Sequence, residues 1–208
     1  MKIIQDEFPN LNKKQIIQFS YLKKLYKDLN NQINLISRKD IENIYVRHVL
    51  HSLAIAKFIK FKHEATIIDL GTGGGFPGIP LAIFFPNSKF ILVDSVRKKI
   101  LAVKEVVNKL ELKNVKLKWA RFEDLEYKYD FLVTRAVAKM PLLIKWSKHG
   151  FNSNSKHEIP NGIIALKGGN INEELNGINE KKILDIKNIF DIQYFYEKKI
   201  VYVPSKFI

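Results

Sequence analysis

The sequence predicts an α/β protein with a mostly parallel sheet, helices on both faces of that sheet and a helical extension at the N-terminus. Three observations support this class. From residue 66 onward, short apolar runs alternate with longer segments of helical periodicity, which is the pattern of a parallel sheet with crossover helices. A glycine-rich turn joins the first of these runs to the helix that follows it. The composition, 46% hydrophobic and 27% charged over 208 residues, is ordinary for a globular protein.

The N-terminal part of the chain lacks strand signals and predicts two helices. Over residues 10–30, apolar side chains recur at helical spacing with lysines between them. Over residues 40–60, Asp40 is a candidate N-cap and an apolar side recurs again. We therefore expect residues 1–62 to form a helical extension packed on a second unit, residues 63–208.

Seven strands are expected in the second unit. Each of the first five is a short apolar run bounded by turn residues, and the last two are placed to form a closing antiparallel pair. The expected strands cover residues 66–70, 89–94, 115–119, 130–134, 162–167, 183–192 and 194–203. The expected helices run from the glycine turn to Phe85, over 96–110 and over 139–150, with a short helix or loop over 172–179.

The composition excludes several classes of site. The chain has no cysteine, so disulfides, zinc–thiolate sites and cysteine nucleophiles are excluded, and we expect no metal ion to take part in function. No apolar run approaches the roughly 18 residues of a membrane-spanning helix, and residues 1–10 do not resemble a secretory signal. We therefore expect the protein to act in the reducing cytoplasm. As a separate expectation, it acts as a monomer.

The net charge of +14 indicates a polyanionic partner, with nucleic acid the first candidate, or a compositional drift toward lysine. The excess is denser in the extension, where 12 basic side chains stand against 5 acidic ones. The lysines of the first predicted helix form either an RNA-binding stripe or a solvated surface. They are Lys13, Lys14, Lys23, Lys24 and Lys27.

The most informative motif is the glycine-rich turn after the first predicted strand. Its pattern is Asp69-x-Gly71-x-Gly73-x-Gly75. Glycine permits a positive φ and a close approach of a ligand, and backbone amides at a helix start form a positive cradle. In nucleotide-binding sheets a carboxylate at the end of the second strand takes the ribose hydroxyls, and Asp94 stands at that place. The alternative is a turn that serves only tight packing.

The nature of the ligand follows from what the turn lacks. A dinucleotide site of the form G-x-G-x-x-G would place its third glycine where Phe76 stands, so an NAD site is disfavoured. The sequence has no G-x-x-x-x-G-K-[ST], so a P-loop is excluded. The form D-x-G-x-G-x-G instead resembles motif I of class I S-adenosylmethionine (SAM) methyltransferases. In that class the turn holds the methionine part of SAM, and the second-strand acid holds its ribose.

A narrower resemblance covers about residues 20–203. The stretch IIDLGTGGGFPGIPLAI, residues 67–83, resembles the signature of the ribosomal RNA small-subunit methyltransferase G family, also called GidB. General methyltransferases lack its segment Phe76–Pro80. The sequence departs from many members at Leu29 and at His51, and we expect His51 to be structural. Further matches come in the family's order, at Val46–Leu50, Val93–Ser95, Lys98–Lys99, Arg121–Glu123, Thr134–Val137 and Leu166–Gly169.

The resemblance implies a class I methyltransferase fold and methyl transfer from SAM to N7 of one guanine. That guanine would lie in the decoding-region loop of 16S small-subunit rRNA, either free or in the ribosomal subunit. Phe76 is expected to make an apolar contact beside the sulfonium, and Phe122 and Glu123 are expected to border the adenine. The cofactor-binding residues that the resemblance and the turn imply are Asp69, Gly71, Gly73, Phe76, Asp94, Ser95, Phe122, Glu123 and Arg135.

Five residues are candidates for RNA contact. Arg47 and His48, on the second predicted helix, either face RNA, cap the cofactor pocket or form a hydrogen-bonded structural pair. Lys98 and Lys99 open the helix after the second strand and either steer phosphate or lie on a solvated face. Lys167 ends the fifth predicted strand, where it is expected to hold an RNA phosphate.

Arg135, at the end of the fourth predicted strand, is the candidate catalytic residue. It is expected to contact the cofactor, the guanine O6 or a phosphate, with a salt bridge to a nearby carboxylate as the alternative. Because guanine N7 carries an in-plane lone pair, we expect no general base. Two other functions stay open, namely a SAM-dependent methyltransferase of another RNA or a small molecule, and a non-catalytic RNA-binding module.

Overall fold

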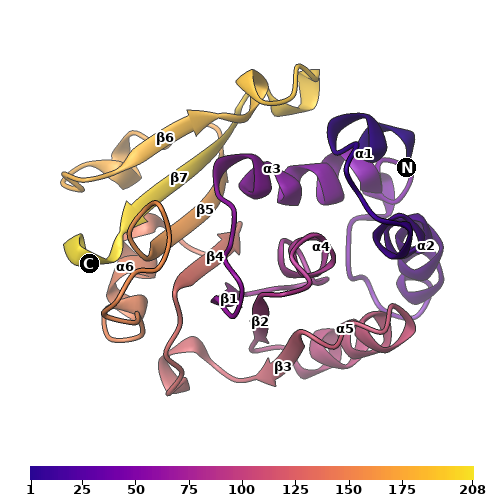
Figure 1. The fold of residues 1–208 in the computed structure, drawn as a ribbon, viewed down its shortest axis with the longest axis horizontal. Coiled ribbons are helices and arrows are strands. Elements are labelled where there is room, and N and C mark those ends of the chain that lie inside the picture. The colour runs from indigo at the N-terminus through magenta and orange to yellow at the C-terminus, as the bar shows by residue number, and fades with distance from the viewer.

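A computed structural model describes all 208 residues, and its centre is a seven-stranded sheet in the order β3-β2-β1-β4-β5-β7-β6 (Figure 1). The strands are β1 (Thr66–Leu70), β2 (Lys89–Asp94), β3 (Val115–Trp119), β4 (Phe131–Arg135), β5 (Gly162–Gly168), β6 (Lys182–Asp185) and β7 (Lys198–Pro204). β7 runs antiparallel to both of its neighbours, β5 and β6, and every other pair of neighbouring strands is parallel. The predicted class, a mostly parallel seven-stranded sheet, is confirmed.

The inner strands are apolar at nearly every position because both of their faces are covered. In β1, Ile67 packs into one hydrophobic cluster and Ile68 into a second cluster on the opposite face. In β4, Leu132 and Val133 divide between the two clusters in the same way. Continuous apolar runs are typical of parallel strands with helices on both sides. For this reason the predicted bounds of these strands agree closely with the observed ones.

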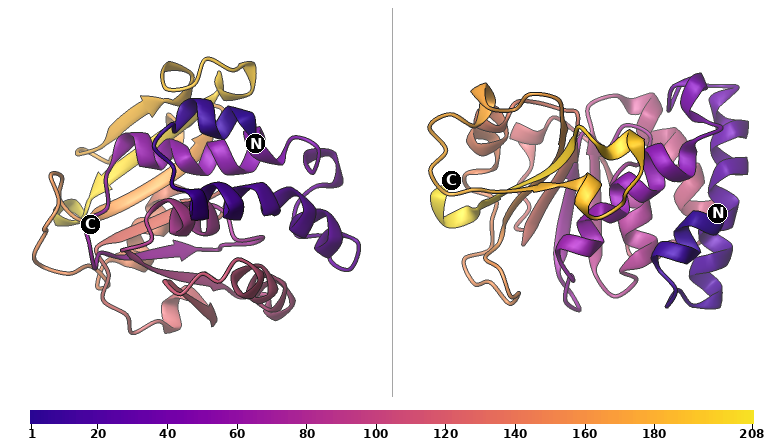
Figure 2. Two further views of the ribbon diagram at one scale, coloured as in Figure 1. Left: turned by 45° about the vertical axis from the view of Figure 1, so that its right-hand side comes forward. Right: turned by 90° about the horizontal axis from the view of Figure 1, so that it is seen from above.

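The two faces of the sheet are covered unequally (Figures 1 and 2). On one face the larger hydrophobic cluster includes side chains of the five helices α1 (Lys2–Glu7), α2 (Lys13–Asn30), α3 (His51–Phe58), α4 (Gly78–Phe84) and α5 (Arg97–Lys109). On the other face the smaller cluster includes α6 (Met140–Ser147). The β3–β4 and β5–β6 connections contain only the short 3₁₀ turns η3 (Phe122–Asp124) and η4 (Glu173–Leu175). This thin cover leaves room for a cleft.

The N-terminal helices differ in part from prediction. The first predicted helix forms as α2 and begins with a capping box between Asn12 and Gln15. The prediction of one regular helix over residues 40–60 is wrong. The segment forms the 3₁₀ turn η1 (Arg38–Asp40), the π-helix η2 (Tyr45–Leu50) and α3. Within the π-helix, the Arg47 carbonyl accepts hydrogen bonds from two residues that are distant in the sequence. The donors are Arg135 Nη1 (3.1 Å) and the Tyr194 hydroxyl.

The C-terminal segment also corrects the prediction. The antiparallel pair is confirmed, but β6 covers four residues instead of 183–192. Two 3₁₀ turns, η5 (Ile186–Asn188) and η6 (Gln193–Phe195), follow it, and a third, η7 (Ser205–Phe207), follows β7. The extended pattern breaks because Phe190 is buried in the larger cluster together with Ile186 and Phe195.

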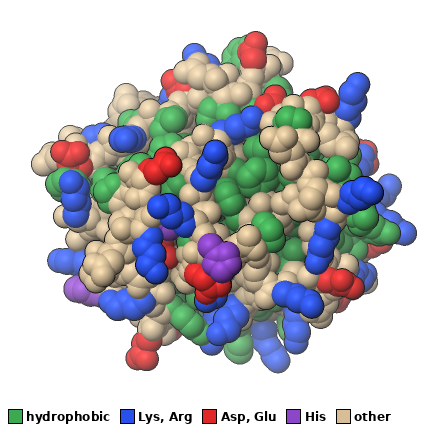
Figure 3. All heavy atoms as spheres, in the orientation of Figure 1, with side chains coloured by type: hydrophobic (Ala, Val, Ile, Leu, Met, Phe, Trp, Pro, Cys, Tyr) green, Lys and Arg blue, Asp and Glu red, His purple; other side chains and the backbone are tan.

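The surface is basic but not uniformly so. The two chain ends lie on opposite sides of the molecule (Figures 1 and 2). On the face in Figure 3, Lys and Arg side chains are spread among Asp and Glu and do not gather into one patch. None of the helices combines the length and the hydropathy that a membrane span requires. Net charge alone therefore does not locate an RNA-binding face.

Candidate functional site

The turn after β1 has the backbone that its glycines predicted. Gly71, Gly73 and Gly75 all adopt a positive φ, of 64°, 57° and 91°. The carboxylate of Asp69 fixes this turn from below, because its Oδ2 atom accepts from the Thr72 hydroxyl (2.6 Å) and from the Gly78 N–H (2.8 Å). Burial raises the pKa of Asp69 to about 7. Asp69 is completely buried, so its placement supports the turn and does not support the predicted direct contact with a cofactor.

The expected cradle of free amides is largely wrong. Thr72 N–H donates to the Val93 carbonyl (2.9 Å), and the amides of Gly75 and Phe76 donate to the Thr72 carbonyl. The Gly73 amide donates to the Asp94 carboxylate (2.9 Å). These bonds close the turn on itself, because a short turn at positive φ folds its own N–H groups inward. Of the amides left without a partner, only that of Gly71 belongs to a residue that borders open space.

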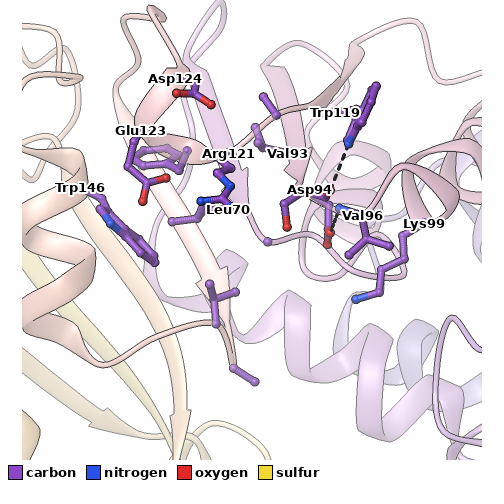
Figure 4. A pocket seen from close by; sticks show the side chains of 16 residues that line it. Leu70, Val93, Asp94, Val96, Lys99, Trp119, Arg121, Glu123, Asp124 and Trp146 are labelled. Atoms are coloured by element: carbon purple, nitrogen blue, oxygen red, sulfur yellow. Dashed lines mark hydrogen bonds between the residues drawn. The ribbon is translucent and has the colours of Figure 1, made fainter.

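A cleft of about 860 Å³ opens at the carboxyl ends of β1, β2, β3 and β4 (Figure 4). In Figure 4, Trp146 and Trp119 stand on opposite sides of it, with Asp94 and Arg121 between them. This is the edge of a parallel sheet at which ligands bind. The lining residues are Leu70, Gly71, Val93, Asp94, Ser95, Val96, Lys99, Trp119, Ala120, Arg121, Phe122, Glu123, Asp124, Ala136, Val137 and Trp146.

Five of the nine predicted cofactor residues line this cleft. They are Gly71, Asp94, Ser95, Phe122 and Glu123. The Asp94 carboxylate bridges the turn and the start of α5, since Oδ2 accepts from the Gly73 amide and Oδ1 from the Val96 amide (2.9 Å each). A carboxylate offers about four acceptor sites, so capacity for hydroxyl donors remains.

Two further predicted residues, Phe76 and Arg135, lie together beneath the turn and not in the cleft. The Phe76 ring is buried, and the guanidinium of Arg135 lies 5.3 Å from its centroid. Arg135 Nη2 donates to His48 Nδ1 (2.7 Å), and no carboxylate forms an ion pair with Arg135. The alternative of a salt bridge at Arg135 is therefore wrong, and the placement of Phe76 does not support its expected contact with the sulfonium. Phe76 is a core residue because it packs between Tyr26 and His48.

Comparisons with known proteins decide the family. The sequence profile described as "GidB: rRNA small subunit methyltransferase G" matches residues 15–200. The chain belongs to this family. It is 49% identical to "Ribosomal RNA small subunit methyltransferase G" of Flavobacterium johnsoniae over 200 residues, which are 96% of each chain. It is also 49% identical to the protein of that name from Flavobacterium psychrophilum over 207 residues, covering 100% of this chain and 99% of the relative.

Solved structures support the fold of this GidB family member. A SAM-dependent O-methyltransferase from Thermotoga maritima superposes with a TM-score of 0.57 at 13% identity, covering 79% of this chain and 70% of that one. Fibrillarin from Aeropyrum pernix, solved with natively bound S-adenosyl-L-methionine, gives a TM-score of 0.55 at 12% identity over 76% and 75%. At such low identity the likeness shows the class I methyltransferase fold alone.

Arg47 and His48, the two residues before β1 that were predicted to contact RNA, lie in different surroundings. Arg47 Nη1 donates to Asp40 Oδ1 (2.5 Å), and its side chain is 40% exposed. His48 is buried, and burial together with Arg135 lowers its pKa to about 4, so the ring is neutral at pH 7. The prediction of a hydrogen-bonded structural role therefore describes His48 better than RNA contact. His51 is buried beside two aromatic rings, as expected of a structural residue.

The three lysines that were predicted to contact RNA also differ in their exposure and in their partners. Lys98 is exposed on the first turn of α5, and Lys99 lines the cleft. The expectation that Lys167 holds a phosphate is wrong in this structure. Its ammonium group donates to the Ala138 carbonyl (2.7 Å) and to Glu174 Oε2 (2.9 Å), and only 11% of its side chain is exposed.

Several lining residues were not predicted as cofactor contacts, although Arg121 and Val137 lie in segments that match the family. Arg121 and Asp124 flank the predicted Phe122–Glu123 pair, and their position directly after β3 was an available signal. Val137 packs against the turn, because a Cβ added at Gly71 would lie 2.4 Å from Val137 Cγ2. Trp146 reaches the cleft from α6, and no local motif marks it.

The residues of the cleft fit SAM. Nine of its 16 lining residues are hydrophobic, which suits an adenine ring, and acceptors for ribose hydroxyls stand at the end of β2. The volume of about 860 Å³ lies in the range of cofactor sites. The residues also form no group of three or more His, Asp or Glu side chains placed to hold a metal ion.

Proposed function

We propose that this protein transfers the methyl group of SAM to N7 of a guanine in the decoding-region loop of 16S small-subunit rRNA. The family supports the reaction, since the matched profile and relatives are rRNA small-subunit methyltransferases G and enzymes of this family use SAM. The observation that carries the proposal to this chain is the cleft at the ends of β1–β4, which brings Gly71, Asp94, Ser95, Phe122 and Glu123 together.

Each cleft residue has a proposed task toward the cofactor. The free Gly71 amide and the tight contact between Gly71 and Val137 define where the methionine part would lie. The Asp94 carboxylate and the neighbouring Ser95 hydroxyl would hold the ribose. Phe122 would give an apolar edge for the adenine, and Glu123 would accept from its amino group.

Methyl transfer to N7 requires alignment and not proton removal. When bound, SAM would supply a methyl group on a sulfonium, and the N7 lone pair of guanine would form the new C–N bond as the C–S electron pair returned to sulfur. No proton moves in this step, so the protein needs no general base. Its residues act by holding the two reacting atoms in line at about 3–3.5 Å and by excluding water from the cleft.

Arg135 is proposed to act at the boundary between cofactor and substrate. Its guanidinium is half-buried beside the glycine turn, where it donates to His48 Nδ1 and to the Arg47 carbonyl but has no carboxylate partner. A cation that is partly removed from water is stabilised when an anionic or strongly polar group approaches it. Proposed partners for Arg135 are the cofactor carboxylate, the guanine O6 and an RNA phosphate. Which of them it contacts decides whether it is a catalytic residue or a positioning residue.

RNA contact is proposed for three cations that are exposed or partly exposed. Lys98 and Lys99 open α5 beside Asp94, and Arg47 remains partly exposed. We further propose that residues 1–62 act as an extension that supports residues 63–208, that the protein works as a monomer, and that it acts in the cytoplasm on the rRNA or the ribosomal subunit. The buried hydrogen bond from Tyr26 on α2 to the Gly74 carbonyl (2.5 Å) supports a direct link between the extension and the turn.

The test is transfer of labelled methyl groups from SAM by the purified protein. Small ribosomal subunits and stripped rRNA that lack the modification serve as substrates, and free metabolites serve as the comparison. Digestion of the RNA should release labelled N7-methylguanosine from one position. Label on another base, or only on a small molecule, would contradict the proposal.

A further inference from the structure

A second hollow adjoins the proposed cofactor cleft beside the loop that follows β4. It has a volume of about 340 Å³ and shares the lining residues Ala136 and Val137 with the cleft. We name it the η4 hollow. Its lining residues are Ala136, Val137, Ala138, Lys139, Lys167, Asn170, Glu173 and Glu174. Because the two spaces share a wall, a substrate base whose reacting atom faces the cleft would extend into this hollow.

The walls of the η4 hollow are tied together by a buried ion pair. Lys167 at the end of β5 donates to the Ala138 carbonyl and to Glu174, and Glu174 Oε2 also accepts from the Met140 amide (3.0 Å). The side chains of this pair are only 11% and 13% exposed. The loop after β4 is thereby fixed to η4, and Ala136 in that loop adopts a positive φ of 55°. Such strain is found where a loop is held for a function.

The ion pair leaves one carboxylate of the η4 hollow without a partner. Glu173 is exposed and forms neither a hydrogen bond nor an ion pair, whereas Glu174 and Lys167 neutralise each other. Asn170 uses its Oδ1 atom to accept from the Asn172 amide (3.0 Å), which leaves its NH₂ group as a donor. Lys139 is exposed at the same rim. The hollow therefore offers one free acceptor carboxylate and two free donors.

This set of groups complements guanine bound with N7 toward the cleft. N7 and O6 of guanine are acceptors, while N1–H and the N2 amino group, on the far side of the ring, are donors. If N7 faces the wall shared with the cleft, the N1–N2 edge faces the distal side of the hollow. In that orientation a carboxylate facing the N1–N2 edge accepts two hydrogen bonds from guanine, but it would meet the N1 acceptor of adenine. Glu173 is the lining carboxylate that has no ion-pair partner. Methylation at N7 also makes the purine cationic, and a nearby carboxylate stabilises that charge.

We propose that the η4 hollow receives the target guanine and that the Glu173 carboxylate accepts hydrogen bonds from its N1–H and N2 amino group. This inference rests on the proposed function and names the part of the chain that selects guanine. Asn170 and Lys139 are the donors available to O6 and to the flanking phosphate. The Lys167–Glu174 pair positions the hollow without touching the base.

The test compares two substrates and three proteins. The substrates are small subunits reconstituted with rRNA that carries guanosine or inosine at the methylated position, since inosine lacks only the 2-amino group. The proteins are the wild type, Glu173→Gln and the control Glu180→Gln, which changes an exposed glutamate outside the hollow that forms no ion pair. SAM affinity is measured by calorimetry for all three.

The wild type should lose about tenfold in kcat/KM on inosine, the effect of one charge-assisted hydrogen bond. Glu173→Gln should lose at least tenfold on guanosine, should no longer distinguish the two substrates and should keep its SAM affinity. Glu180→Gln should match the wild type. Equal wild-type activity on both substrates, equal losses by Glu173→Gln on both, or weakened SAM binding would overturn the inference. A wild type that fails to methylate the guanosine substrate would instead refute the proposed function.

Discussion

Arg135 donates a 2.7 Å hydrogen bond to Nδ1 of His48, and this bond joins the end of β4 to the N-terminal extension. The bond requires an unprotonated Nδ1, and the lowered pKa of His48, about 4, provides it at neutral pH. The imidazole and the Arg47 carbonyl hold the guanidinium over Phe76 at the base of the glycine turn. Arg47 and His48 therefore help to fix the position of Arg135 beside the proposed cofactor cleft.

Replacement of Arg135 tests its proposed role. Arg135→Ala should lower turnover at least tenfold, about 1.4 kcal/mol of barrier, because the cation beside the turn is lost. The measurement is methyl transfer to small-subunit rRNA, with circular dichroism to show that the fold persists. Arg38→Ala, at an exposed arginine of η1, should retain full activity.

A double-mutant cycle shows whether His48 acts through Arg135. His48→Ala should cost less than Arg135→Ala, and the double variant should be no slower than Arg135→Ala alone, because residues in one network are not additive. Near-normal turnover of Arg135→Ala, or additive losses in the double variant, would contradict this role.

Gly71 and Gly169 form a matched pair for testing the turn. Both adopt a similar φ, +64° and +70°, but an added Cβ at Gly71 would clash with Val137, whereas at Gly169 it would meet nothing within 4 Å. Both alanine variants should lose about 1–2 kcal/mol of stability from the left-handed backbone. Only Gly71→Ala should also lose SAM affinity in calorimetry. Equal SAM affinity in the two variants would count against the placement of the cofactor.

Variants of the Lys167–Glu174 ion pair show whether Lys167 stabilises the fold or contacts RNA. Lys167→Met should lower the free energy of unfolding by about 3 kcal/mol, because it leaves the mostly buried Glu174 carboxylate without a counter-charge and with only the Met140 amide as a partner. The double variant Lys167→Met/Glu174→Leu should recover most of that loss, as measured by urea unfolding. If Lys167 holds a phosphate instead, Lys167→Met would leave stability unchanged and would flatten the salt dependence of RNA binding.

The pKa of Asp69 predicts a pH dependence of stability. Its folded value of about 7 lies above the ordinary value of 3.8, so between these values the folded state binds a proton that the unfolded state has lost. Asp69 therefore makes stability fall as the pH rises from about 4 to 7. Asp69→Asn keeps an acceptor for Thr72 and Gly78 but cannot titrate.

The check is the melting temperature of both proteins across this pH range. The melting temperature of the wild type minus that of Asp69→Asn should decrease from pH 4 to 7 and then level off. The lowered pKa of His48 acts in the opposite direction below pH 6.5, but it is present in both proteins and cancels in the difference. A constant difference would show that Asp69 titrates normally.

The fold was predictable where burial is strong and local. β1 and β2 lie at the expected residues and are buried along nearly their whole length, since apolar runs between turn signals leave little choice of register. The π-helix over Tyr45–Leu50 was not predictable, because it accompanies bonds from distant residues to the Arg47 carbonyl. Helix α1 was also missed, since six residues carry almost no periodicity and the burial of Ile4 is a tertiary effect.

The site was predictable in its residues more than in their contacts. The spacing of Gly71 and Asp94 correctly placed both at one sheet edge. The partners of Arg135 and Lys167 were not visible, because His48 and Glu174 approach them only after the chain has folded. A long cation at the end of a strand gives the same sequence signal whether it reaches out to RNA or inward to a carboxylate.

The most direct measurement is a map of N7-methylguanosine in the small-subunit rRNA of cells with and without this protein. The map should lose one modified guanine in the decoding-region loop when the protein is absent. That guanine should regain the methyl group when the wild type is restored, but not when Gly71→Ala is. An unchanged map, or full restoration by Gly71→Ala, would contradict the account.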